Sequence, residues 1–121
     1  MPAAPEYPKP PAPGRLKRRA EFLRVAAKGR KAPVPGLVLQ ALRRDDADPV
    51  RLGFTVTKKV GNAVVRNRTR RRLKEAARLL LKGHTVTGFD LVLIGRGGTR
   101  KRPFLALQDD IRRALSRAGV P

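Results

Sequence analysis

The sequence predicts a single α+β domain whose elements follow in the order helix, strands, helix, strand, helix. The chain has 121 residues, enough for one hydrophobic core and too few for two ordinary ones. Hydrophobic residues make up 40% of it, so a folded core is expected despite the high charge. They recur with helical spacing in three segments and in denser, strand-like runs between them, which gives the element order.

A proline-rich tail, residues 1–14, precedes the predicted domain, which covers residues 15–121. The prolines of the tail, MPAAPEYPKPPAPG, favour an extended, disordered and solvated arm. A ligand for a proline-binding partner is the alternative interpretation. The tail lacks the continuous apolar core of a signal peptide, so the chain is expected to be cytoplasmic.

The first helix is predicted within LKRRAEFLRVAAKG, residues 16–29. Phe22, Val25 and Ala26 stand at positions i, i+3 and i+4 and therefore share one face. Gly29 is placed to end the helix.

Two strands are predicted next, in LVLQALRR (37–44) and VRLGFTVTKK (50–59). The segment DDADP between them has the Asp and Pro content of a tight connection. We therefore expect the two strands to pair as an antiparallel hairpin. A short additional strand is expected around Lys31 to Val34.

The second helix is predicted from about Ala63 to Lys82, with Asn62 as its N-cap. One buried stripe at three- and four-residue spacing supports it. The stripe consists of Thr69, Leu73, Ala76, Ala77 and Leu80.

The mostly apolar run GFDLVLIGR, residues 88–96, predicts a central strand covered on both faces or nearly so. The last helix is predicted in RPFLALQDDIRRALSRAG, between Pro103 and Gly119. Its apolar face consists of Phe104, Leu107, Ile111, Leu115 and Ala118.

The charge of the chain points to a polyanionic partner. Lys and Arg number 29 against 9 Asp and Glu, which gives a formal net charge of +20 at pH 7. Because so many like charges repel one another, the chain is expected to bind a polyanion that neutralises them. Nucleic acid is the leading candidate. A membrane surface is disfavoured, because no apolar run has the length of a spanning helix and the basic helix has no Trp or Phe on its apolar face.

The positive charge is densest in GNAVVRNRTRRRLKEAAR, residues 61–78, where only Glu75 interrupts it. Solubility alone would favour interspersed signs, so polyanion binding explains the run better than a merely solvated face. Arg66 lies seven residues before Leu73 and projects along the buried stripe. We expect neighbouring backbone to hold its guanidinium, which then offers phosphate a planar fork of donors beside the amide of Asn67.

No catalytic residue is expected in the protein. With no Cys, one His (His84) and one Ser (Ser116), nucleophile and base arrangements of the triad kind cannot be assembled. His84 is expected at a helix end or in a loop rather than as a ligand.

The carboxylates also have structural interpretations. Asp45, Asp46 and Asp48 fall in the predicted turn, where Asp is favoured, and are not expected to bind Mg²⁺. Asp109 and Asp110 lie in the first turns of the last helix, where acidic residues complement the helix dipole. No metal site is therefore expected.

The segment LGFTVTKKVGNAVVRNRTRRRLKEAAR, Leu52 to Arg78, resembles the bacterial ribonuclease P protein subunit family. It carries that family's strand, Lys-Lys-Val-Gly-Asn-Ala turn and Arg-Asn-Arg helix in order and without gaps. Weaker matches are LKRRAEFLRVAAKGR with the first helix, LVLQAL with the next strand and FDLVLIGRGG with the last strand. The resemblance implies an α/β sandwich with a left-handed crossover helix (ribosomal protein S5 domain 2-like), where topology rules alone predict a right-handed one.

The resemblance also implies a role as the accessory protein subunit of the ribonucleoprotein endonuclease ribonuclease P. Such a subunit binds the catalytic RNA and the 5′ leader of precursor tRNA, while the RNA performs the Mg²⁺-dependent 5′ maturation. These two RNAs are the expected partners, and no membrane is expected as a partner. The protein itself is expected to be monomeric. No cofactor is expected on protein side chains; Mg²⁺ is required by the RNA-based holoenzyme.

Residue by residue, the resemblance implies two groups of contacts. The group expected to bind RNA is Lys58, Lys59, Asn62, Arg66, Asn67, Arg68, Arg70, Arg71, Arg72 and Lys74. The group expected to bind the leader is Lys17, Arg18, Phe22, Arg24 and Thr55. Phe22 matches an aromatic on which an unstacked base can rest, or else is a core residue. Ala26 and Gln40 stand where the family often has two further aromatics.

Two other classes of function remain open at this point. A ribosomal protein would share the charge and a similar fold. A nuclease that acts without RNA would need carboxylates such as Asp45 and Asp46 as metal ligands.

Overall fold

The computed structural model describes residues 12–82 and 85–121. Most of the predicted tail and His84 therefore lie outside the described residues. The elements are β1 (Gly14–Arg15), α1 (Arg19–Lys28), β2 (Arg30–Val34), β3 (Leu37–Arg43), β4 (Arg51–Val56), the 3₁₀ turn η1 (Lys58–Val60), α2 (Ala63–Leu81), β5 (Phe89–Gly95), the 3₁₀ turn η2 (Thr99–Lys101) and α3 (Phe104–Arg117). The α+β class is confirmed, and so is the predicted order of helices and strands from α1 onward, but the short strand β1 before α1 was not predicted.

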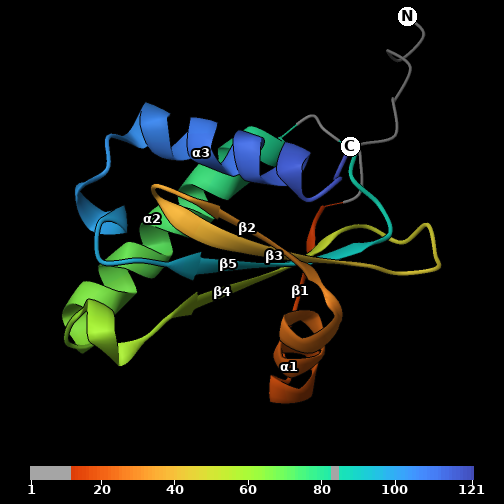
Figure 1. Ribbon diagram of the computed structural model, residues 1–121, viewed down its shortest axis with the longest axis horizontal. Coiled ribbons are helices and arrows are strands. Elements are labelled where there is room, and N and C mark those ends of the chain that lie inside the picture. The colour runs from red at the N-terminus through yellow and green to blue at the C-terminus, as the bar shows by residue number, and fades with distance from the viewer. Residues whose placement is uncertain (1–11, 83–84) are drawn as a thin grey trace, which may run out of the picture.

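One mixed five-stranded sheet forms the centre of the fold, in the order β1-β4-β5-β3-β2 (Figure 1). β4 runs parallel to both β1 and β5, whereas β3 runs antiparallel to both β5 and β2. β5 is the middle strand, as its mostly apolar run predicts. Gly14, which we expected in the tail, pairs with Arg51 in the sheet.

The predicted hairpin between the strands now labelled β3 and β4 is wrong. β5 lies between them and pairs with both. The connection after β3 is instead tied to the segment that leads into β5. Its backbone bonds are Arg44 N–H to Gly88 O at 2.7 Å, Val50 N–H to Val86 O at 3.0 Å and Gly88 N–H to Asp48 O at 2.9 Å.

The hairpin of this fold is formed by β2 and β3. The additional strand expected around Lys31 to Val34 is confirmed as β2, and it pairs antiparallel with β3 across the turn at Pro35 and Gly36. Because β2 covers the outer side of β3, the other side of β3 is left for β5.

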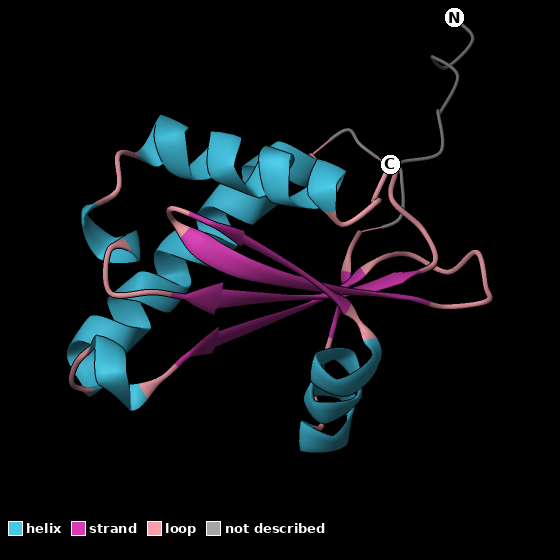
Figure 2. Cartoon of the chain, viewed as in Figure 1, coloured by secondary structure: helices cyan, strands magenta, loops and turns pink. Residues whose placement is uncertain are grey.

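Period-two alternation along the strands separates two cores. Leu52, Phe54 and Val56 of β4 face the main core beneath α2 and α3, while Gly53 and Thr55 face the side of α1. α2 packs on β4 and β5, α3 packs on β2 and β3, and α1 packs on β3 and β5. The sheet is thus sandwiched between helices (Figure 2), as the family resemblance implied.

α2 joins the neighbouring parallel strands β4 and β5, and so occupies the expected crossover position. Its buried residues are Thr69, Leu73, Ala76, Ala77 and Leu81. The predicted stripe therefore holds except at its end, where Leu81 is buried and Leu80 only half-buried. In α1, Val25 is buried and Phe22 half-buried, but Ala26 is exposed.

α3 contains a departure from the predicted amphipathic pattern. Leu107, Ile111 and Ala114 are buried, and Asp110 is buried with them at 1% exposure. Asp110 accepts two hydrogen bonds from Arg102, at 2.8 and 3.1 Å. Its role is therefore a buried ion pair, and the expectation that it merely complements the helix dipole is wrong.

No helix among the described residues combines the length and the apolar character that a membrane crossing requires.

Candidate nucleic-acid interface

The N-terminus of α2 is built by the turn that precedes it. The side chain of Asn62 accepts a hydrogen bond from the backbone of Val65 at 3.0 Å and so caps the helix as predicted. η1 places Lys58 and Lys59, both exposed, immediately before this cap. The turn therefore combines two cations with the positive end of the helix dipole.

The first half of α2 carries basic side chains around most of its exposed circumference. Asn67, Arg68, Arg71 and Lys74 are exposed, whereas Arg66, Arg70 and Arg72 are half-buried where the helix meets its neighbours. Arg70 donates to the side-chain oxygen of Asn67 at 3.0 Å, which orients both groups. The sequence-predicted RNA contacts of this helix thus make its solvent-facing side a basic surface.

Two of these arginines behave differently from expectation. We expected the backbone to hold Arg66, but its Nε is buried and has no hydrogen-bond partner among residues 12–82 and 85–121. It is the guanidinium of Arg72 that backbone groups hold, because its Nη1 donates to Thr99 O at 2.8 Å and to Arg100 O at 2.9 Å. Arg72 therefore holds η2 against α2, a role that its place in a basic run did not reveal.

The cations of this surface have no carboxylate partners within the described residues. The ion pairs of the described residues join arginines outside η1 and α2 to Glu21, Asp46, Asp90, Asp109 and Asp110. Within α2, Glu75 pairs with Arg78 in the second half of the helix. The charges of η1 and of α2 before Glu75 are left for solvent counterions or an external polyanion.

The predicted leader contacts lie on the opposite face of the sheet, around α1. The ring of Phe22 lies over Gly53, where an added Cβ would be 2.5 Å from Phe22 Cε1, so only glycine allows this approach. Thr55 follows on the same face of β4 and is half-buried. Phe22 packs at the margin of the smaller core and is half-buried, so its ring retains exposed surface.

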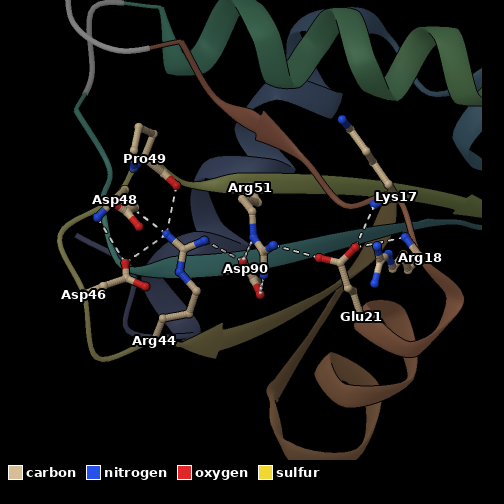
Figure 3. Close-up of polar contacts among 9 residues, drawn as sticks. All are labelled: Lys17, Arg18, Glu21, Arg44, Asp46, Asp48, Pro49, Arg51 and Asp90. Atoms are coloured by element: carbon tan, nitrogen blue, oxygen red, sulfur yellow. Dashed lines mark hydrogen bonds and ion pairs between the residues drawn. The ribbon is translucent and has the colours of Figure 1, made fainter.

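The remaining predicted leader contacts lie immediately before α1 and at its middle. Lys17, Arg18 and Arg24 are exposed. The backbone N–H groups of Lys17 and Arg18 donate to Glu21 Oε1 at 3.1 and 2.9 Å (Figure 3). Hydrogen bonding from Arg18 and Lys17 lowers the pKa of Glu21 below its ordinary 4.5. The start of α1, and with it two cations, is thereby fixed.

β4 connects the two predicted contact groups. β1 pairs only with Arg51 and Leu52, so from Gly53 onward β4 is an edge strand within the described part of the chain. Thr55 lies on the α1 side of this edge, and the strand then continues into η1 and α2. A nucleic acid that follows this edge can therefore contact both groups.

An ion-pair network fixes α1 on the sheet (Figure 3). Asp90, 4% exposed, accepts from Arg51 Nε and Nη2 at 2.8 and 2.7 Å and from Arg44 Nη1 at 2.8 Å. Arg51 Nη1 also donates to Glu21 at 2.7 Å. Hydrogen bonding to Asp90 raises the pKa of Arg51. This network was not predicted from the sequence, although a lone Asp within an apolar strand must find a partner when buried.

The turn of residues 45–49, which contains Asp45, Asp46 and Asp48, is held together by local contacts. Asp46 accepts from Asp48 N–H at 3.0 Å and pairs with Arg44 at 3.2 Å. Arg44 also donates to the carbonyls of Asp48 and Pro49 at 3.0 and 2.9 Å. In residues 12–82 and 85–121, no group of three or more His, Cys, Asp or Glu side chains is placed to hold a metal ion.

Comparison with known proteins identifies related chains. The Ribonuclease P family model matches residues 11–119. A "Ribonuclease P protein component" of Gluconacetobacter diazotrophicus is 70% identical over 106 residues, covering 88% of this chain and 91% of the relative. The component of the same name from Paramagnetospirillum magneticum is 52% identical over 110 residues, covering 88% of this chain and 83% of the relative.

Solved structures of RNase P proteins also superimpose on this chain. A structure of the Staphylococcus aureus RNase P protein superimposes with a TM-score of 0.72 at 30% identity, covering 88% of this chain and 95% of that one. The RNase P protein from Thermotoga maritima also gives 0.72, at 28% identity, covering 85% of this chain and 96% of that one.

Proposed function

The chain belongs to the ribonuclease P protein family, as a bacterial protein component of this tRNA-processing ribonuclease, and from this we propose how it acts. It binds the catalytic ribonuclease P RNA and the 5′ leader of precursor tRNA in the cytoplasm, as a monomer. The catalytic groups and the required Mg²⁺ reside in the RNA, and the protein promotes their 5′ maturation of tRNA.

The observation that carries this proposal is the unpaired positive charge on η1 and the first half of α2. Eight cations there, from Lys58 to Lys74, take part in no ion pair with another described residue. Like charges at helical spacing repel one another, and RNA phosphates relieve that repulsion when they replace condensed counterions. This surface therefore favours an RNA partner.

In the proposed complex, α2 contacts the catalytic RNA. The planar guanidinium groups of Arg66, Arg68 and Arg70 suit phosphate oxygens. Lys58 and Lys59 add point charges beside the positive end of the helix. These fixed cations screen repulsion between closely packed phosphates, as additional Mg²⁺ ions would, and so reduce the Mg²⁺ concentration that the RNA needs.

The leader follows the α1 side of the β4 edge. One unstacked base rests on the exposed part of Phe22, and Lys17, Arg18, Arg24 and Thr55 contact the backbone. Stacking of a base on an aromatic side chain contributes about 1–3 kcal/mol. Because Ala26 and Gln40 offer no further rings, most leader affinity comes from phosphate contacts and depends strongly on salt.

A binding experiment tests the leader part of this proposal. The affinity of the reconstituted holoenzyme is measured for precursor tRNA and for mature tRNA without a leader, each at several salt concentrations. We expect the protein to tighten binding of the precursor selectively, with the selectivity falling as salt rises. Equal tightening of both RNAs would show that the α1 face does not contact the leader.

A further inference from the structure

The loop of residues 96–102, hereafter the η2 loop, forms a second basic element beside α2. It contains Arg96, Arg100, Lys101 and Arg102 within the sequence RGGTRKR. None of these residues belongs to the predicted RNA-binding or leader-binding groups, and Arg100 and Lys101 are exposed.

Buried hydrogen bonds hold the centre of the η2 loop in one conformation. Thr99 is 0% exposed. Its hydroxyl donates to Gly36 O at 2.6 Å and accepts from the backbone N–H of Arg96 at 2.7 Å. The loop is thus attached at its centre to the β2–β3 turn.

Three arginines anchor the rest of the loop. Arg96 Nη1 donates to Val34 O at 2.8 Å. Arg102 forks onto the buried carboxylate of Asp110, and Arg72 of α2 donates to the carbonyls of Thr99 and Arg100. Each of these guanidinium groups therefore has a protein partner.

The two other basic side chains of the loop, Arg100 and Lys101, have no such role. Within the described part of the chain neither forms an ion pair. They are adjacent on a 3₁₀ turn whose backbone is held from both sides. Such a rigid scaffold lowers the entropic cost of binding a phosphate backbone.

The position of Arg72 shows which side of α2 adjoins this loop. Arg68 lies one turn before Arg72 and shares its flank. Arg70 is two residues from each of them, about 200° around an ideal helix axis, and so lies on the far flank together with Lys74; Arg66, one turn before Arg70, lies between that flank and the buried stripe. Basic groups on the two flanks of α2 thus project in nearly opposite directions.

We propose that the η2 loop is a second phosphate-binding site, in which Arg100 and Lys101, together with Arg68, bind a segment of RNA backbone distinct from the segment bound by Arg66 and Arg70. The protein then joins two segments of its RNA partner across α2. This inference rests on the proposed function, because it takes the catalytic RNA as the ligand.

A pair of charge-removal variants tests the proposal. Arg100→Ala/Lys101→Ala removes two charges from the η2 loop, and Arg66→Ala/Arg70→Ala removes two from the other side of α2. The matched control is Arg30→Ala/Lys31→Ala on β2, which removes the same charge from exposed positions. Thermal unfolding of each variant verifies that it is folded.

The readouts are the salt dependence of affinity for the catalytic RNA and the backbone positions that the protein protects from hydroxyl-radical cleavage. Loss of two contacts at the η2 loop should lower the slope of log affinity against log salt by about 1.4 to 1.8. Protection should then disappear from one RNA segment, while Arg66→Ala/Arg70→Ala removes it from another. The control should keep both segments protected.

Two other results overturn the proposal. If Arg100→Ala/Lys101→Ala matches the control in slope and footprint while Arg66→Ala/Arg70→Ala weakens binding, the η2 loop binds no RNA but the proposed function stands. If both double variants lose protection at the same nucleotides, there is one binding site rather than two. Failure of the unmodified protein to bind the catalytic RNA would instead contradict the proposed function itself.

Discussion

Arg51 and Asp90 form a forked ion pair between the neighbouring parallel strands β4 and β5, with Nε–Oδ1 and Nη2–Oδ2 distances of 2.8 and 2.7 Å. The carboxylate is nearly fully buried, and Arg44 supplies a third donor to it. Because Arg51 also reaches Glu21, the same guanidinium connects the sheet to α1. The position of the α1 face thus depends on an ion pair within the sheet.

Replacement of Asp90 by Asn should destabilise the protein strongly. It leaves two guanidinium groups without their carboxylate in a partly buried site, and breaking a buried pair from one side costs about 3–5 kcal/mol. Urea unfolding measures this change in the free energy of unfolding. The matched control is Asp109→Asn, whose ion pairs with Arg112 and Arg113 are exposed and should contribute less than about 1 kcal/mol. Equal losses in the two variants would contradict this account of the network.

Glu21 should make the stability of the protein depend on pH in the acid range. Its folded-state pKa lies below the ordinary 4.5, so its contribution is fully present above pH 4.5 and is lost as the pH falls through the lowered folded value. Unfolding free energies measured from neutral pH downward should fall more steeply for the unmodified protein than for Glu21→Gln. Parallel pH profiles would show that the carboxylate does not fix α1.

Gly53 and Phe22 should be energetically coupled. Gly53→Ala places a Cβ against the ring and should cost about 1–3 kcal/mol through overpacking. In a Phe22→Ala background the ring is absent, and the same substitution should cost less than about 1 kcal/mol. A double-mutant cycle on unfolding free energies measures the coupling. Gly97→Ala serves as the control, because nothing lies within 4 Å of its added Cβ; additive costs at Gly53 and Phe22 would argue against the contact.

Replacing Arg72 should destabilise the protein, whereas replacing its neighbour Arg71 on the same helix should not. Arg72→Ala removes two hydrogen bonds to η2 carbonyls and should lower the free energy of unfolding by about 2 kcal/mol. Arg71→Ala removes the same charge from an exposed position and should change it by less than about 0.5 kcal/mol. Chemical denaturation compares the two. Indistinguishable stabilities would mean that Arg72 does not hold the η2 loop.

Much of the fold could be predicted from the sequence because its signals are local. The cap at Asn62, the periodicity of α2 and the apolar run of β5 each depend on nearby residues. The partner of β3 could not be predicted in this way. Consecutive strands often pair, and no short-range feature indicates that β5, which follows β3 by about 50 residues, takes the place between β3 and β4.

The candidate site, too, could be predicted from the sequence only in part. The basic run was found from residue type and spacing, because its charge is dense, whereas Phe22 was assigned to the site only by the family resemblance. The roles of Arg72 and Asp110 were missed, because the partner of each lies outside its own helix: Arg72 donates to carbonyls of η2, and Asp110 accepts from Arg102 in the loop before α3. Asp90 alone carried a usable signal, a single charge inside the apolar run of β5.

The RNA contacts of α2 should be visible at low Mg²⁺. Arg66→Ala and Arg68→Ala should each weaken the protein's stimulation of the catalytic RNA and lower the salt slope of binding by about 0.7 to 0.9 for each lost phosphate contact. Arg112→Ala, an exposed substitution on α3, should change both quantities less. Unchanged low-Mg²⁺ activity in the α2 variants would count heavily against this surface.

The most direct test is cleavage of a precursor tRNA by the catalytic ribonuclease P RNA at low Mg²⁺, with the protein added, with it omitted, and with the protein alone. The proposed function predicts accurate 5′ cleavage that requires both components and no cleavage by the protein alone. Cleavage by the protein without RNA, or no stimulation by a protein that still binds the RNA, would contradict it.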